Sequence, residues 1–291
     1  MASSKSIRGR IQSIKNTRQI TKAMKMVSAV KLRKAQLNVV NSRPYARRIL
    51  SVISNIAVTQ RVEHPLLSRN ESPKSVLIVV LTSDRGLCGS FNSSIQRFSE
   101  KYYFENKNKY EKMDFLFIGR KAAEYFKKHK VQPVQVILNM AKEISYTYAT
   151  KIADLLIEKY LVGHYDEIRM VYNEFKSAIA QNVVCETLLP IDLSRATLKE
   201  EDGVSKDFIF EPQPGAIIEQ LLKKHFSVQV YRCMSESVAA EHGSRMTAME
   251  NATNNANEVI RKTTIIYNNL RQAAVTTQLI EITSGAEALK G

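Results

Sequence analysis

Apolar positions divide the chain into two long helical ends and a middle of short segments. Between Ile7 and Ile56, apolar side chains recur at helical spacing, and only Gly9 and Pro44 interrupt the run as helix breakers. This spacing predicts a helix from Lys5 to Ala57. Pro44 removes one backbone hydrogen bond, so we expect it to bend this helix without ending it.

The C-terminal end carries a coiled-coil register. Its seam positions alternate steps of four and three: His242, Met246, Met249, Thr253, Ala256, Ile260, Thr263, Tyr267, Leu270, Ala274 and Thr277. Many of these side chains are small or β-branched, so the pattern favours close approach of two helices over deep burial. We expect a helix from Ala216 to Ser284. Because each terminal helix needs a partner for its apolar stripe, the two are predicted to pair antiparallel and to project as a stalk.

The middle of the chain alternates short β-rich runs with helical stretches. The predicted strands are Val76–Leu81, Phe115–Ile118, Val134–Leu138 and Ile168–Tyr172, separated by helices near Ser90–Asn108, Arg120–His129 and Tyr146–Val162. Later strands are expected at Val183–Leu189 and Phe208–Phe210, with a polar loop at Ser194–Lys206. This alternation is typical of a Rossmann-like, doubly wound α/β sheet. The predicted organisation is an N-terminal coiled-coil helix over 1–60, a central α/β domain over 74–212 and a C-terminal coiled-coil helix over 214–286.

Positive charge is concentrated at the N-terminal end. The chain of 291 residues has 43 Lys and Arg against 28 Asp and Glu, a formal net charge of +15. Fourteen of the basic residues lie before Glu63, and no acidic residue precedes it. Fourteen charges of one sign without an acid, thirteen of them on a predicted helix with an apolar stripe, predict an acidic partner surface.

The residues give little support for catalysis. The turn from Thr82 to Asn92 follows a strand and leads into a helix, where an α/β protein would hold a phosphate, but it lacks both GxGxxG and GxxxxGK[ST]. We interpret it as a structural turn, with Cys88 as a structural thiol. The five histidines show no metal-ligand spacing. We therefore predict no catalytic residue, no cofactor and no metal. The longest aliphatic run, Val76–Leu81, is far too short to cross a membrane.

The residues considered so far leave two functions open. A cationic coiled-coil protein could bind nucleic acid through its basic arm, although Tyr45 is the only aromatic residue among the first 62 and base stacking would have almost no platform. A nucleotide-using α/β enzyme is the third possibility.

Four segments, in order, connect the sequence to a known family. They read IQSIKNTRQITKAMKMVSAVKLRK at Ile11–Lys34, TSDRGLCGSFN at Thr82–Asn92, FIFEPQP at Phe208–Pro214 and QLIEITSGAEAL at Gln278–Leu289. Together they closely resemble the gamma subunit of the rotary ATP synthase. The resemblance implies two terminal helices in an antiparallel coiled coil with an α/β domain between them. It also implies a non-catalytic rotor shaft that transmits torque between the membrane c ring and the ring of alpha and beta subunits, with the epsilon subunit as a further partner.

The resemblance also assigns contact residues. Contacts with the catalytic ring are expected at Lys15, Arg18, Lys22, Met24, Lys25, Arg271, Gln272, Thr276 and Glu281. Contacts with the c ring and epsilon are expected at Phe208 and Glu211. Two positions depart from the family pattern: Lys25 replaces an acid found in some relatives, and Gln278 stands where many have Glu. Without a plastid-type insertion or a transit peptide, the chain is expected to be bacterial and peripheral on the cytoplasmic face of the cell membrane, with no nucleic-acid partner and no membrane insertion of its own.

Overall fold

The computed structural model describes residues 4–60, 64–68, 70, 72–139, 144–177, 180–193 and 214–289. The chain forms two compact units. One combines Met1–Ser28 with Met246–Gly291, and the other comprises Ala29–Arg245.

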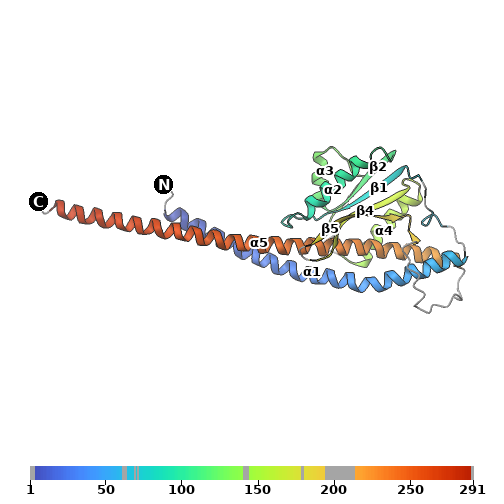
Figure 1. The fold of residues 1–291 in the computed structure, drawn as a ribbon, viewed down its shortest axis with the longest axis horizontal. Helices are drawn as coiled ribbons and strands as arrows, with labels where there is room; N and C mark the ends of the chain where they lie inside the picture. Colours follow the sequence, from blue (N-terminus) through green and yellow to red (C-terminus); the bar gives the residue numbers. More distant parts are fainter. Residues whose placement is uncertain are drawn as a thin grey trace. The chain divides into compact units, whose positions relative to one another are not determined.

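Two long helices, α1 (Ser4–Gln60) and α5 (Pro214–Ala288), each contribute to both units. Figure 1 shows them as the blue and the orange-to-red ribbons. Their bounds confirm the helices predicted from the apolar spacing. Pro44 lies inside α1, so it does not end the helix. It cannot donate to the carbonyl of Val40, and the side chains of both residues are exposed.

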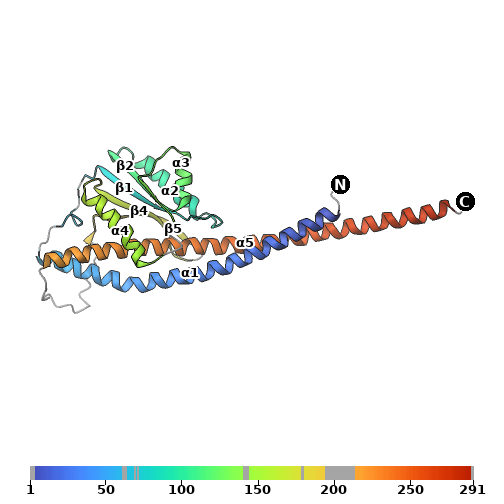
Figure 2. The same cartoon turned by 180° about the vertical axis from the view of Figure 1, so that it is seen from behind.

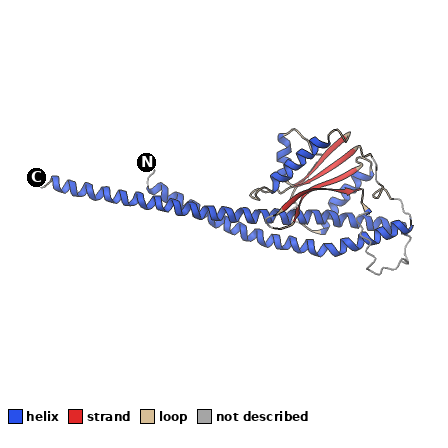
Figure 3. Cartoon of the chain, in the orientation of Figure 1, coloured by secondary structure: helices blue, strands red, loops and turns tan. Residues whose placement is uncertain are grey.

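A five-stranded sheet forms the centre of the larger unit (Figure 3). The strands are β1 (Ser75–Leu81), β2 (Lys112–Ile118), β3 (Gln135–Ile137), β4 (Glu167–Phe175) and β5 (Gln181–Leu189), in the order β3-β2-β1-β4-β5. The first four are parallel and β5 runs antiparallel to β4. The helices between them are α2 (Phe91–Asn106), α3 (Arg120–Lys128) and α4 (Tyr146–Leu161).

The α/β architecture predicted from the alternating pattern is therefore confirmed. Five of the six predicted strands and all three short helices are present within a few residues of their expected bounds. The predicted strand at Phe208–Phe210 and the polar loop at Ser194–Lys206 lie outside the described residues.

The core of the larger unit forms around β1, whose residues Val76 to Leu81 are fully buried. A cluster of aromatic side chains, among them Phe91, Phe115 and Phe126, packs against this strand, and Ala240 of α5 belongs to the same cluster. Helix α5 therefore completes the core of the α/β domain, and Figure 2 shows it running beside the sheet. From Cys233 to Gly243 every residue of α5 is buried.

The starts of β1 and β4 are held together by one carboxylate. Asp166 accepts hydrogen bonds from the backbone N–H groups of Lys74 at 2.9 Å and Ser75 at 2.8 Å, and from the Ser75 hydroxyl at 2.8 Å. Burial opposes ionisation of Asp166, but these bonds outweigh it and lower the pKa of the carboxyl below its ordinary value.

Candidate partner-contact site

Polar contacts join the two helices of the smaller unit. Arg18 donates to the amide oxygen of Asn257 at 3.3 Å, the hydroxyls of Thr21 and Thr253 lie 2.8 Å apart, and the ammonium of Lys25 bonds Glu250 at 2.7 Å. We call these three pairs the polar ladder. In each pair the residue numbers total 274 or 275, so α1 and α5 are antiparallel with a constant register.

The predicted seam is confirmed over part of its length. Met249 and Ala256 are buried, and Ile260, Tyr267 and Leu270 are partly buried. The constant register places Ser4, where the described part of α1 begins, level with residue 271. From Arg271 to Glu287 every residue of α5 is exposed. The predicted extension of the seam to Ala274 and Thr277 is not buried, because both side chains are exposed.

The turn after β1 uses its polar groups within the chain. Asn92 accepts a hydrogen bond from the backbone N–H of Ser83 at 3.0 Å and donates to the Ser83 hydroxyl at 2.8 Å. Asp84 accepts from the backbone N–H groups of Arg120 at 3.1 Å and Asn139 at 2.9 Å. The chain's own carboxylate thus occupies backbone donors at the carboxyl ends of β2 and β3, where a ligand of an α/β sheet would bind. Burial raises the pKa of the Cys88 thiol, which disfavours a nucleophilic thiolate.

Gly119 allows β2 to continue into α3 directly against this turn. Its φ is +106°, and a Cβ atom built there would lie 2.1 Å from the carbonyl oxygen of Thr82. The Thr82 hydroxyl accepts from the backbone N–H of Ala122 at 2.9 Å. Only glycine fits this close approach of two backbones.

Helix α5 covers the same end of the sheet. Arg245 donates to the backbone carbonyls of Arg85 at 3.4 Å and Gly86 at 3.2 Å, and also bonds Glu241 at 2.7 Å. Gln181, the first residue of β5, donates to the carbonyl of Ala240 at 2.9 Å. The crevice that many α/β proteins keep for a nucleotide is in contact with a helix of the same chain.

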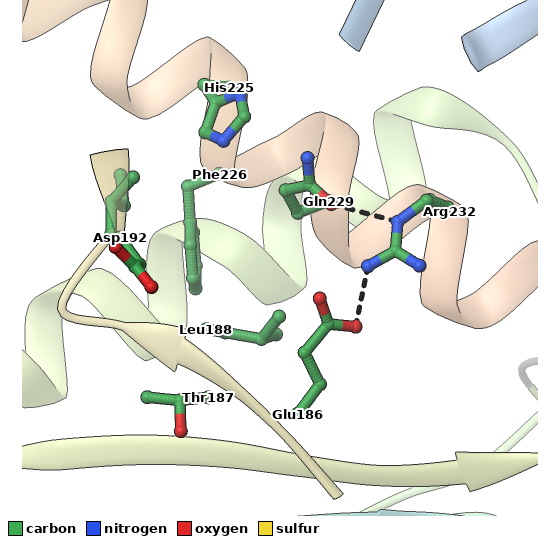
Figure 4. A pocket seen from close by; sticks show the side chains of 9 residues that line it. Glu186, Thr187, Leu188, Asp192, His225, Phe226, Gln229 and Arg232 are labelled. Atoms are coloured by element: carbon green, nitrogen blue, oxygen red, sulfur yellow. Dashed lines mark hydrogen bonds and ion pairs between the residues drawn. The ribbon is translucent and has the colours of Figure 1, made fainter. Parts of the chain in front are cut away.

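A cavity of about 230 Å³ lies between β5 and α5 (Figure 4). Arg232 faces it and bonds Glu186 at 2.6 Å and Gln229 at 2.9 Å, so its charge is already compensated within the chain. His225 also lines the cavity, and its Nδ1 has no hydrogen-bond partner in the described part of the chain. Burial, with the nearby Arg232 charge, lowers the pKa of His225 to about 4. The ring is therefore neutral at physiological pH.

The described residues offer neither a metal site nor a membrane span. They contain no group of three or more His, Cys, Asp or Glu side chains arranged to hold a metal ion. No helix among them is long and apolar enough to span a membrane.

Comparison with known proteins identifies the family. The sequence model of the ATP synthase family matches residues 3–289. The chain is 60% identical over its full length to the ATP synthase gamma chain of Bdellovibrio bacteriovorus and 46% identical to that of Geobacter sp. (strain M21), and each alignment covers the whole relative. The chain belongs to the ATP synthase gamma chain family. The resemblance read from the four sequence segments is thereby confirmed.

Solved structures of ATP synthase rotors contain chains with this fold. The central stalk and c-ring structure of Tetrahymena thermophila mitochondrial ATP synthase contains a chain with a TM-score of 0.61 and 30% identity, covering 80% of this chain and 99% of that one. A rotor chain of Euglena gracilis mitochondrial ATP synthase has a TM-score of 0.63 at 21% identity, covering 94% and 98%. The second likeness concerns the fold alone.

The contact residues expected for a gamma chain fall into three groups. In α1, Lys15 and Lys22 are exposed, while Arg18, Met24 and Lys25 are partly buried. The second group lies on α5, in the exposed segment that begins at Arg271 and extends beyond Ser4, the first described residue of α1; it comprises Arg271, Gln272, Thr276 and Glu281. Phe208 and Glu211 lie outside the described residues. The structure thus brings the first group together on one helix and the second on another, and their role in partner contact stays a prediction.

Sequence reasoning missed what Arg18 and Lys25 do inside the gamma chain. Both were expected to face a partner, but their charged groups bond Asn257 and Glu250 across the helix pair. A signal was present, because Glu250 and Asn257 each directly follow a seam residue, Met249 and Ala256. A side chain one position past the seam lies at the edge of the helix interface, where charged residues pair.

The surface of this helix pair is both cationic and apolar. The described part of α1 in the smaller unit carries seven basic residues and no acid, and its Ile20, Met26 and Val27 are largely exposed. On α5, Leu279, Ile280 and Ile282 are more than half exposed. Such a surface suits a protein partner, because apolar side chains gain from burial against protein while the charges select an acidic surface.

Proposed function

We propose that this gamma chain is the central rotor shaft of a proton-translocating ATP synthase and transmits torque between the membrane c ring and the ring of alpha and beta subunits. The observation that carries the proposal is the full-length identity of 60% to an ATP synthase gamma chain. The likeness in fold to a chain of a central-stalk structure, with a TM-score of 0.61 and 30% identity, supports it. In this proposal the chain is a non-catalytic subunit, and ATP chemistry takes place on its partners.

The helix pair of the smaller unit supplies the asymmetry that such a shaft needs. Helix α1 exposes basic side chains. Beyond Leu270, α5 instead exposes Leu279, Ile280 and Ile282 and carries few charges. A shaft with different faces interacts differently with each of several identical surrounding subunits. Because a conformational equilibrium shifts only through differential interaction with its states, rotation of these faces would favour the open and closed forms of each subunit in turn.

We assign the contacts with the catalytic ring to two sets of exposed residues. Lys15 and Lys22 would meet acidic side chains of the ring, and Arg271, Gln272, Thr276 and Glu281 would hydrogen-bond it from the unpaired part of α5. Phe208 and Glu211 are assigned to the contact with the c ring and epsilon. Through that contact the chain would be held at the cytoplasmic face of the cell membrane as a peripheral subunit.

Co-purification tests the assignment to the complex. The tagged chain is isolated from detergent-solubilised membranes, and bound proteins are identified by mass spectrometry. We expect alpha, beta, epsilon and c subunits. Absence of the nucleotide-binding subunits would overturn the proposal. Specific binding of duplex DNA by the purified chain, weakening steeply as salt is raised, would favour the nucleic-acid function.

Deleting residues 208–211 tests the contact with the membrane ring. We expect proton-driven ATP synthesis to be lost while ATP hydrolysis by the soluble complex is largely retained, since the deleted segment is assigned to the base and not to the catalytic ring. Loss of soluble hydrolysis in a correctly assembled complex would contradict this assignment.

A charge experiment tests the contact with the catalytic ring. Lys15→Gln with Lys22→Gln removes two exposed charges from α1 and preserves helix propensity. We expect weaker assembly with a smaller dependence on salt. Lys107→Gln with Lys109→Gln removes the same charge from exposed positions of the α/β domain and serves as the matched control. Equal effects of the two variants would show that only net charge matters.

A further inference from the structure

The interface between the helices of the smaller unit becomes polar over four consecutive seam positions of α1. After Ile14, the positions at steps of four and three are Arg18, Thr21, Lys25 and Ser28. Thr21 is only 8% exposed and Ser28 only 2%. An apolar seam tolerates sliding, because one aliphatic contact replaces another. A polar seam does not, since each buried donor or acceptor needs its own partner.

The sequence of α5 makes the observed register distinctive. A slide of one heptad in either direction would place Thr21 opposite Met246 or Ile260 instead of Thr253. The same slide would place Lys25 opposite Gly243 or Asn257 instead of Glu250. In both shifted registers a threonine hydroxyl is buried against an apolar side chain and the lysine loses its acid. The apolar contacts alone would not distinguish these alternatives as sharply.

We infer that the polar ladder sets the axial register of α1 against α5 and so fixes how much of α5 extends past the start of α1. The residues that carry this role are Arg18, Thr21 and Lys25 with their partners Asn257, Thr253 and Glu250. They are positioning residues. A slide of seven residues would move the first unpaired residue of α5 by about 10 Å, at 1.5 Å per residue. Every contact made by the exposed residues from Arg271 onward would move with it.

The members of the ladder contribute unequally. The Lys25 and Glu250 side chains keep 38% and 47% of their surface exposed, so water screens their attraction and the pair alone stabilises the structure little. The Thr21–Thr253 contact is more buried. Each hydroxyl also donates to a carbonyl of its own helix, Thr21 to Arg18 at 3.0 Å and Thr253 to Met249 at 2.7 Å, so the pair fits closely where the two helices meet. We assign most of the register specificity to the threonine pair, with the ion pair as a second element that depends on the sign of the charges.

Disulfide trapping in the full-length chain tests the inference. Ile14→Cys with Ile260→Cys reports the native register, because these numbers also total 274. Ile14→Cys with Tyr267→Cys and Ile7→Cys with Ile260→Cys report slides of seven residues in opposite directions. With the ladder intact, we expect only the native pair to cross-link above the level of the parent chain. The ladder-free variant carries Thr21→Val, Lys25→Met, Glu250→Met and Thr253→Val. In this variant we expect the cross-linking yield of the two cysteine pairs that report slides to rise at least tenfold.

Charge reversal separates register control from loss of folding. Lys25→Glu alone brings two carboxylates together and should lower the native cross-link severalfold, whereas Lys25→Glu with Glu250→Lys should restore it. Helicity by circular dichroism accompanies each variant. The inference is overturned if the ladder-free chain, still helical, traps only the native pair. It is equally overturned if the reversed pair cross-links no better than Lys25→Glu alone, a comparison that holds even where the ladder-free chain does not fold.

Discussion

Arg232 of α5 and Glu186 of β5 form an ion pair of 2.6 Å in which the side chains keep only 19% and 18% of their surface exposed. The hydroxyl of Tyr172 accepts a further bond from Arg232 at 3.0 Å and donates to Glu186 at 3.0 Å. The three side chains come from two strands and one helix, so they attach α5 to the sheet. A charge pair this far from water is costly to break from one side only.

We predict that Arg232→Met destabilises the chain by about 2 to 4 kcal/mol, because Glu186 would stay largely buried without its guanidinium. Denaturant unfolding measures the loss. The matched control is Lys223→Met, which breaks the Lys223–Glu219 pair one turn apart on α5, with 47% and 54% of the side chains exposed. That change should cost much less than Arg232→Met, because water screens an exposed pair. Equal losses would show that burial of the Arg232 pair has no energetic importance.

Gly119→Ala should be among the most damaging small substitutions in the α/β domain. The new Cβ would overlap the Thr82 carbonyl, and the positive φ adds strain, so we expect a loss of more than about 2 kcal/mol. Gly163→Ala separates the two effects, since its φ is +77° but nothing lies within 4 Å of the added Cβ. It should cost about 1 kcal/mol. A Gly119→Ala chain as stable as Gly163→Ala would contradict the close approach to Thr82.

The two alanines of the predicted seam should respond differently to enlargement. Ala256 is buried between the helices, so Ala256→Leu is expected to overpack the pair and cost about 1 to 3 kcal/mol. Ala274 is exposed, and leucine has good helix propensity, so Ala274→Leu should leave the thermal unfolding of the isolated chain nearly unchanged. Losses of stability of similar size in both variants would show that the seam extends to Ala274.

Acid should destabilise the larger unit through His225. Its pKa is lowered to about 4 in the fold against an ordinary value of 6.5, so the unfolded chain binds more protons between these pH values. Stability is then fully present above about pH 6.5 and falls as the pH drops toward 4, by about 3 kcal/mol for this group. We predict that His225→Gln reduces the slope of unfolding free energy against pH in this window.

The control for the pH experiment is His164→Gln, because His164 is exposed. Comparing slopes, and not absolute stabilities, removes the cost of the substitution itself. Glu241 acts in the opposite sense, since burial raises its pKa and protonation on acidification favours the fold. It is present in both variants and so does not affect the comparison. An unchanged slope in His225→Gln would show that the histidine takes up no proton on unfolding.

The elements that the sequence predicted well are those in which apolar residues recur at a regular spacing or form an unbroken run. The apolar spacing located α1 and α5 almost to their ends, and the aliphatic run of β1 located the centre of the sheet. The direction of β5 was not predicted, although a signal existed: only five residues separate Phe175 from Gln181. So short a link suits a hairpin and cannot make a parallel crossover.

The details of the site were beyond such patterns because they depend on distant parts of the chain. Asp84 bonds the backbone of Asn139, and Lys25 bonds Glu250, which is 225 positions away. Periodicity reports which face of a helix is apolar but not how far one helix is displaced along another. The end of the seam at Leu270 could therefore be seen only once the cross-helix contacts had fixed the register.

The end of the pairing at Leu270 also has a mechanical consequence. Two rods bonded side by side resist bending and twisting far more than either rod alone, because bending one must stretch or compress the other. In the described chain, stiffness therefore falls abruptly where α5 continues without α1. Under load, deformation would concentrate in the last five turns of α5. The part of α5 that is paired with α1 would rotate almost as a rigid body.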